Sequence, residues 1–266
     1  MANLNRSAKS SRDWIKYDLR AFNIQIQLED KITFFGDPNL PLPVIDEEIL
    51  TTLKGKDMLS DHNAELIHLL DRAKQPVAGG SAVDDFTVEL LRQLGYVKRN
   101  RVAHTQMDIP LHICQEQKHA KTLICLLDHL TNDICLLIQE DELRSPLETL
   151  PQLIAEAIAA VDFNNRLQVT LRGEAVIESK ACDSLNFIMP GIIQTGTMPT
   201  FCKIPVTNDL LRNVWFGTYP SEPTIVSVHI PDLPSPHHRY VKGMEPLDNR
   251  QAVLCCYEAF KHIVGI

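Results

Sequence analysis

The sequence predicts an α/β (α+β) protein in which a mixed central sheet is flanked by helices. Helical and strand patterns follow one another between residues 82 and 206 in the order helix, strand, strand, strand, helix, strand. Two of the strand segments, Thr122–Leu127 and Ile134–Gln139, are almost continuously apolar, which is typical of strands buried on both faces. Helices on both sides of such a sheet would complete a layered sandwich.

The first 80 residues (1–80) are expected to form an extension that packs on a core domain of residues 81–266. Apolar and polar residues alternate from Phe22 to Leu28, and this period of two predicts a half-buried strand. Residues 31–35, KITFF, are interpreted as a second strand. Helices are expected over two further segments, from about Asp46 to Lys54 and from about Asp61 onward.

The core domain is expected to begin with a helix at residues 82–94. Val83, Phe86 and Leu90 lie on one apolar stripe of that helix, and this spacing is the amphipathic pattern of a helix that packs on a core. Gly95 is a suitable residue to end it. The following elements are expected to be strands near residues 101–107, 111–115, 122–128 and 134–140, and then a helix near 150–163.

The C-terminal third of the chain has weaker patterns. Met189–Phe201 is punctuated by glycine and proline, and we interpret it as a loop that closes over a sheet edge. Thr195, Thr197 and Thr200 are candidate polar contacts of that loop, since loops often carry function. The remaining expected elements are strands near residues 168–171, 201–206 and 224–230 and a final helix near 249–263.

Composition limits the classes of partner and the compartment. The net charge is −8, which disfavours a nucleic-acid partner because a basic surface supplies most of the affinity for a phosphate backbone. No apolar run reaches the roughly 18 residues of a membrane span, so no membrane partner is expected. Cysteines such as Cys125 and Cys135 lie inside apolar runs, which indicates a reducing cytoplasmic or nuclear compartment.

A basic cluster stands out against the acidic total. Two interpretations of this cluster are possible: it is an ordinary solvated surface, or it is a rim that faces phosphate groups. Its members are Lys98, Arg99, Arg101, His104, Lys118, His119 and Lys121.

Six segments carry a resemblance to a known family. They are SAVDDFTVELLRQLGY (81–96), IPLHICQEQKHAKTLICLLD (109–128), ICLLIQEDE (134–142), PQLIAEAIAAVDFNN (151–165), GTMPTFCKIPVT (196–207) and GMEPLDNRQAVLCCYEAF (243–260). Together they resemble the PD-(D/E)XK nuclease-like proteins that are abundant in mushroom-forming fungi. The resemblance implies a restriction-endonuclease-like core, αβββαβ, with additions at both ends of the chain.

The resemblance also implies a site with a degenerate motif. In PD-(D/E)XK enzymes an aspartate on one strand and the glutamate of a Glu-x-Lys strand end bind magnesium, and the lysine positions the attacking water. Glu140 keeps the glutamate position and is the one candidate metal ligand of that motif. Leu123 takes the aspartate position and Glu142 the lysine position. Because a hard cation needs clustered carboxylate oxygens, the resemblance implies a silent or strongly altered site.

Other acids are candidates for a rearranged site. Strand alternation would place Glu140 and Glu142 on one face and Asp141 on the other. Glu116 lies just beyond one predicted strand and Glu89 lies on the predicted first helix of the core, so either is a candidate to join the cluster around a cation. The alternative is that the three consecutive acids simply end a buried strand in water.

Three further residues complete the candidate site. Lys121 is the nearest lysine to the Glu140 region and is the candidate replacement for the missing catalytic lysine. Gln152 and Glu156 lie four residues apart on the helix that follows the strand, so they share a helix face. They are candidates to contact either the site or a bound ligand, and the alternative is that they are ordinary surface residues.

Three functional classes remain open. The first is a catalytically silent PD-(D/E)XK-like domain that binds a protein or small-molecule partner. The second is a metal-dependent phosphodiesterase with a rearranged acidic site, and the third is a small-molecule enzyme that uses the same cleft. No cofactor is expected for the first class, whereas Mg²⁺ or Mn²⁺ would belong to the second.

Overall fold

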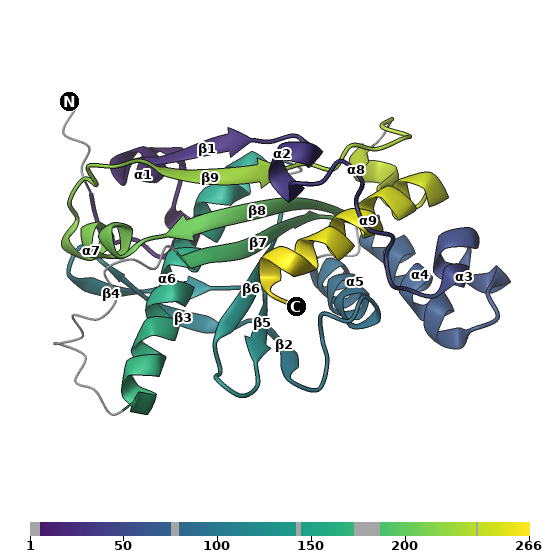
Figure 1. Cartoon of the computed structure of the whole chain (residues 1–266), viewed down its shortest axis with the longest axis horizontal. Helices are drawn as coiled ribbons and strands as arrows, with labels where there is room; N and C mark the ends of the chain where they lie inside the picture. The colour runs from purple at the N-terminus through teal and green to yellow at the C-terminus, as the bar shows by residue number, and fades with distance from the viewer. Residues whose placement is uncertain (1–5, 76–79, 142–144, 173–186, 238) are drawn as a thin grey trace.

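The computed structural model describes residues 6–75, 80–141, 145–172, 187–237 and 239–266. Its strands in the main sheet are β1 (Ile24–Leu28), β2 (Arg101–Thr105), β5 (Ile124–Asp128), β6 (Ile134–Glu140), β7 (Phe187–Thr195), β8 (Met198–Val206) and β9 (Thr224–His229). They are ordered β1-β9-β8-β7-β6-β5-β2 across the middle of the molecule (Figure 1). The pairs β1–β9 and β6–β7 are parallel and the other neighbours are antiparallel.

Helices cover both faces of this mixed sheet. They are α1 (Lys16–Ala21), α2 (Lys31–Phe35), α3 (Glu47–Thr51), α4 (Asp61–Ala73), α5 (Gly80–Gln93), α6 (Pro146–Arg172), α7 (Asn208–Phe216), α8 (Arg239–Lys242) and α9 (Leu247–Val264), with 3-10 turns η1 (Ser11–Asp13) and η2 (Gly55–Asp57). Leu137 of β6 belongs to a buried cluster with α6, whereas Ile138 belongs to another with α5 and α9. The sheet is therefore buried on both faces, which confirms the predicted α/β class.

The predicted order is confirmed from the first helix of the core to α6: α5, β2, β3 (Asp108–Ile113), β5, β6 and α6 follow one another, with β4 (Glu116–Lys121) as an unpredicted strand between β3 and β5. β5 pairs antiparallel with β6, as expected. α6 lies close to the sheet because its contact face includes small residues such as Ala157, which is fully buried. Opposite it, a Cβ on Gly191 of β7 would lie 2.9 Å from Leu153 Cδ2. No helix in the described part of the chain is long and apolar enough to cross a membrane.

A two-stranded sheet is inserted between β2 and β5 in the chain. It consists of β3 (Asp108–Ile113) and β4 (Glu116–Lys121), which pair antiparallel, and it packs against α6. The N–H groups of its turn residues, Cys114 and Gln115, donate to carbonyls of α7 at 2.9 and 2.7 Å. No apolar pattern indicates β4, because Ala120 is its one buried residue and the others are polar.

Three predicted elements are wrong. Residues 168–171 are not a strand, because they continue α6. Residues 31–35 form the short helix α2 rather than a strand: Asp30 Oδ1 accepts the Thr33 N–H at 2.9 Å, and Gly36 ends the helix with φ 79°. Met189–Phe201 is not a loop, since β7 and β8 form a hairpin there.

The N-terminal extension contacts the core domain at two places. β1 pairs with β9 at one edge of the main sheet, with Ile24 opposite Thr224. At the other end of the molecule (Figure 1), α3 contacts α9 and α4 contacts α5. Arg250 of α9 is buried and its guanidinium donates to Ile49 O at 2.7 Å and to Thr52 O at 3.0 Å.

Candidate functional site

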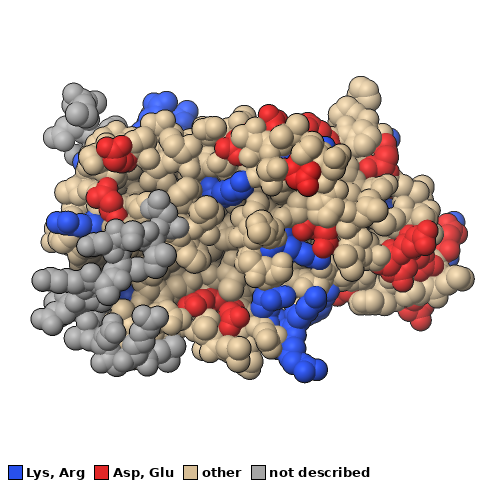
Figure 2. All heavy atoms as spheres, viewed as in Figure 1, with Lys and Arg blue, Asp and Glu red and all other residues tan. Residues whose placement is uncertain are grey.

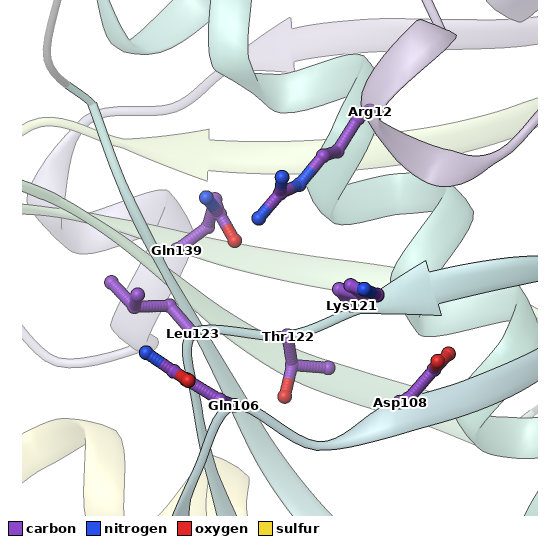
Figure 3. Close-up of a pocket in the computed structure, with 7 residues that line it drawn as sticks. All are labelled: Arg12, Gln106, Asp108, Lys121, Thr122, Leu123 and Gln139. Carbon is purple, nitrogen blue, oxygen red and sulfur yellow. The ribbon is translucent and has the colours of Figure 1, made fainter.

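A polar groove lies where η1, the β3–β4 hairpin and the end of β6 meet. It consists of two cavities of about 290 and 300 Å³, which share Arg12, Asp108 and Lys121 (Figure 3 shows the first). We call these two cavities the polar groove. The residues lining one cavity only are Gln106, Thr122, Leu123 and Gln139 in the first and Ser10, Ser11 and His119 in the second.

β4 brings a cation and an imidazole to the groove. Alternation along the strand puts His119 and Lys121 on one face and Ala120 on the other, and Ala120 is buried against the core beneath α6. Asp108 pairs with Lys121 in the β3–β4 register. Asp108 also lies close to the imidazole of His119: its Oδ1 atom is 3.1 Å from His119 Nδ1. The Asp108 carboxylate therefore already has a hydrogen-bonding partner within the groove.

The chain passes from the hairpin to the main sheet at Thr122 and Leu123. Thr122 N–H donates to Met107 O at 3.0 Å, and Gln106 N–H donates to Leu123 O at 2.8 Å. Gln106 adopts a left-handed φ of 57°, so its backbone turns where the strands diverge. These main-chain bonds hold one wall of the groove.

η1 places Arg12 over the groove. Its neighbours Ser11 and Trp14 are buried, and Trp14 stacks on Phe22 with ring centroids 5.6 Å apart. Arg12 and Gln139 point toward each other across the first cavity (Figure 3). Arg12 is exposed and makes no hydrogen bond or ion pair with any residue that the structure describes.

Glu156 is a buried carboxyl behind the groove. It lies on α6, which packs against η1, and its side chain is fully buried. Gln152 Nε2 donates to Glu156 Oε1 at 3.0 Å. Burial raises the pKa of Glu156 to about 8, and the Gln152 hydrogen bond and the nearby Arg12 charge oppose that rise. Glu156 is therefore mostly neutral at pH 7.

Several buried polar atoms around the groove lack a partner within the described part of the chain. They are Thr122 Oγ1 and Gln139 Oε1 in the first cavity, Ser11 Oγ in the second, and Glu156 Oε2 behind them. Buried polar atoms are normally hydrogen-bonded in folded proteins. Their concentration here indicates a place for a polar ligand or for ordered water.

The groove carries a local positive charge. Arg12 and Lys121 line both cavities, and Asp108 is the acid among the lining residues. On the face seen in Figure 2, acidic side chains gather at the end of the molecule formed by α3 and α4. The basic cluster noted in the sequence is divided, since Lys98, Arg99 and Arg101 lie at or beside β2, whereas Lys121 lies in the groove.

Among the three consecutive acids, the structure places two. Glu140 ends β6 and is half-buried, but it is not among the groove-lining residues. Asp141 is buried; its Oδ1 accepts Thr149 Oγ1 at 3.1 Å and its Oδ2 accepts Thr195 Oγ1 at 3.0 Å. Its contacts therefore tie β6 to α6 and β7. Glu142 lies outside the described residues.

The other candidate acids lie away from Glu140. Glu89 of α5 accepts Gln93 Nε2 at 3.3 Å and lies 3.5 Å from Arg92 Nη1. Glu116 is exposed and pairs with Lys118 Nζ at 2.7 Å. Within the described residues, no group of three His, Cys, Asp or Glu side chains is placed to hold a metal ion.

The structure brings together some predicted residues and adds others. Lys121 lines the groove, but it ends β4, and Leu123, which was expected on the same strand, lies in the connection between β4 and β5. Gln152 contacts Glu156, as their helical spacing suggested. Sequence reasoning missed Arg12 and Gln139. Gln139 shares its strand face with Leu137 and therefore with α6, but alternation alone does not show which face of this apolar strand meets that helix.

Comparison with known proteins gives no family for this chain. No protein-family model matches the sequence, and no curated protein matches it either. The resemblance to PD-(D/E)XK nuclease-like proteins accordingly remains a prediction.

Proposed function

We propose that this protein is a binding domain that holds a small anionic ligand in the polar groove, and that it does not act as a magnesium-dependent nuclease. The observation that carries the proposal is the pair of cations, Arg12 and Lys121, that line both cavities without an ion-pair partner among the described residues. A bidentate guanidinium and a lysine ammonium are the side chains that proteins use to hold phosphate and carboxylate groups.

The buried polar atoms support a ligand that also forms hydrogen bonds. Gln139 Oε1 is an acceptor without a partner in the described part of the chain, and Thr122 Oγ1 can donate or accept. A ligand with an anionic group between Arg12 and Lys121 and hydroxyl or amine groups beside it would satisfy both kinds of site. The volumes of about 290 and 300 Å³ suit a small molecule.

The placement of the acids favours binding over hydrolysis. Gln139, a neutral amide, lines the groove, whereas the adjacent Glu140 does not. Metal-assisted phosphodiester cleavage requires carboxylate oxygens gathered around the cation. Arg12 and Lys121 can bind an anion without a metal ion.

Anion titration tests the proposed function. Calorimetry with inorganic pyrophosphate should show binding at neutral pH that weakens about tenfold or more in Arg12→Ala and in Lys121→Ala, since each loses a charge-assisted hydrogen bond. Arg20→Ala and Lys118→Ala are matched controls, because Arg20 lies on α1 and Lys118 on β4 and neither lines the groove. Equal losses in the control variants, or unchanged binding in the groove variants, would contradict the proposal.

A nuclease assay tests the second half of the proposal. We expect no appreciable Mg²⁺- or Mn²⁺-dependent cleavage of DNA or RNA by the intact protein. The decisive control is Glu140→Ala, which alters the candidate metal ligand. Robust cleavage that EDTA and Glu140→Ala both abolish would replace the binding proposal with a rearranged metal-dependent phosphodiesterase.

A further inference from the structure

β1 leaves one edge of the main sheet open. It is the outermost strand at its end of the sheet and pairs with β9 on one side (Figure 1). Glu29 N–H, just after the strand, donates to Val228 O of β9 at 2.8 Å. Because the main-chain groups of alternate residues in a strand point to the same side, the odd-numbered residues of β1 face β9. The N–H and C=O groups of Ile24, Ile26 and Leu28 therefore point outward.

This edge lacks both a partner and the usual protection. None of its three outward-pointing residues forms a main-chain hydrogen bond on that side with any residue that the structure describes. Their side chains share one face of the strand, on which Ile24 is buried with α6 but Ile26 and Leu28 are 39% and 59% exposed. Proline, lysine or a bulge commonly blocks an exposed edge, and Ile24–Leu28 contains none of them.

The opposite edge of the main sheet, β2, is better protected. Arg101 N–H donates to Lys98 O at 2.9 Å, and Lys98 N–H donates to Arg101 O at 3.2 Å. These bonds close the start of the β2 edge on itself. β2 also carries the basic side chains of Arg101 and His104, which disfavour pairing with another copy of the same strand. β1 is therefore the edge that is suited to pair.

We propose that β1 pairs antiparallel with β1 of a second copy of this chain, so that the two main sheets become continuous across a twofold axis. Ile26 would lie opposite Ile26 of the second copy, and Ile24 would lie opposite Leu28. Directly opposite side chains in an antiparallel pair lie on the same face and contact each other. One pairing would therefore satisfy the outward main-chain groups and cover the exposed side chains of Ile26 and Leu28. The inference does not depend on the proposed function.

The end of the edge where β1 begins is basic. α1 lies immediately before the strand and contacts it. Lys16 and Arg20 of α1 are exposed and have no ion-pair partner among the described residues. The acid between them, Asp18, is paired with Lys9 Nζ at 2.8 Å. The two cations of α1 are therefore available to a neighbouring molecule.

The end of the edge where β1 stops is acidic. Glu29 and Asp30 follow the strand, and Lys31 offsets one of these two charges. Asp30 is exposed. Antiparallel pairing would bring the basic end of one copy to the acidic end of the other, and the twofold axis would repeat this contact. Parallel pairing would bring like charges together, so the charges favour the antiparallel arrangement.

Sedimentation velocity of the full chain from about 1 to 100 µM tests the pairing, since weak interfaces associate in this range. The fraction of dimer should rise with concentration. Ile26→Lys places a charge at the centre of the edge and should give a monomer throughout. Val102→Lys is the matched control, because Val102 is a similarly exposed apolar residue on β2, and it should leave the dimer unchanged. A monomer in the unmodified protein, or a dimer that Ile26→Lys does not weaken, would overturn the proposal.

A charge reversal tests the antiparallel arrangement. Arg20→Glu makes both ends of the edge acidic and should weaken the dimer about tenfold. Arg72→Glu is the control: Arg72 is exposed on α4, at the other end of the molecule (Figure 1), and its reversal changes the net charge equally. Dimerisation should be unaffected in that variant. Equal weakening in both variants would show that net charge rather than the β1 edge is responsible, and would overturn the arrangement.

Amide hydrogen exchange locates the contact without any variant. At concentrations that give the dimer, the amides of Ile24, Ile26 and Leu28 should exchange more slowly than in dilute protein. The amides of Gln25 and Gln27 face β9 and should exchange equally in both samples. Concentration-dependent protection at β2 instead of β1 would overturn the proposal. So would a chain that stays monomeric and gains protection at β1 only from an extended peptide of another protein.

Discussion

Glu156 should make the stability of the protein depend on pH. Its pKa is raised from 4.5 to about 8 by burial, so between these values the folded state binds more protons than the unfolded state. Stability should therefore fall as pH rises from about 5 to about 8, by roughly 3–5 kcal/mol at full ionisation. Urea unfolding at both pH values should show that Glu156→Gln loses most of this dependence. An equal pH dependence in the two proteins would contradict the prediction.

Asp141 should matter for stability more than for binding. Its carboxylate accepts hydroxyl hydrogen bonds from Thr149 and Thr195 and is buried. Asp141→Ala should lower the free energy of unfolding by about 3 kcal/mol, because both hydroxyls lose a charged acceptor. Glu116→Ala is the control: its ion pair with Lys118 is at the surface, and its loss should cost less than about 1 kcal/mol. Equal effects in chemical denaturation would show that Asp141 is not a structural tie.

At the scale of elements, apolar pattern predicted the strands and helices that lie wholly within the core. β5, β6 and α6 have long apolar runs and were located from the sequence. β4 was missed, because a strand outside the main sheet needs few buried residues. The β7–β8 hairpin lies in a segment whose pattern predicts a loop, since Gly191 and two prolines punctuate it. The missing Cβ of Gly191 makes room for Leu153 of α6.

The β7–β8 turn packs against Gly243 near the C-terminal helix, and this contact between elements should make Gly243 sensitive to substitution. Gly243 has φ 50°, and a Cβ there would lie 1.9 Å from Thr197 Oγ1, the acceptor of the Met244 N–H. Gly243→Ala should therefore cost more than about 3 kcal/mol, from backbone strain together with the clash. Gly36→Ala is the matched control, because Gly36 has φ 79° but nothing within 4 Å of its added Cβ. It should cost about 1–2 kcal/mol in thermal or chemical unfolding. Comparable losses in both variants would refute the steric argument.

At the scale of the whole molecule, the groove residues could not be predicted from the sequence because they come from three separate regions of the chain. Arg12 comes from the N-terminal extension, Lys121 from the inserted hairpin and Gln139 from the main sheet. Because β6 is apolar on both faces, its pattern does not reveal whether Gln139 or Glu140 faces α6. Only the packing of Leu137 against α6 and of Ile138 against the other helices decides this. The net charge of −8 likewise conceals a locally basic groove.

The N-terminal extension is built into both cores. Trp14, Phe22 and Ile24 belong to the buried cluster around α6, and Phe34 and Ile49 belong to the cluster around α9. β1 also covers the edge of β9. Removal of the extension would expose these apolar surfaces and leave the β9 edge without its partner, which favours association with other chains. It would also remove Arg12 from the groove.

We therefore expect that residues 81–266 alone do not form a stable monomer. Circular dichroism should show a broad unfolding transition rather than a cooperative one, and sedimentation should show aggregates. Arg250→Met in the full chain is a milder test of the same contact. The buried guanidinium donates to carbonyls of the extension at 2.7 and 3.0 Å. The substitution would leave those carbonyls without their donor. It should lower stability by about 2–4 kcal/mol while leaving the protein folded. A monomeric, cooperatively unfolding 81–266 chain would instead establish that region as an independent domain and the first 80 residues as a dispensable cover.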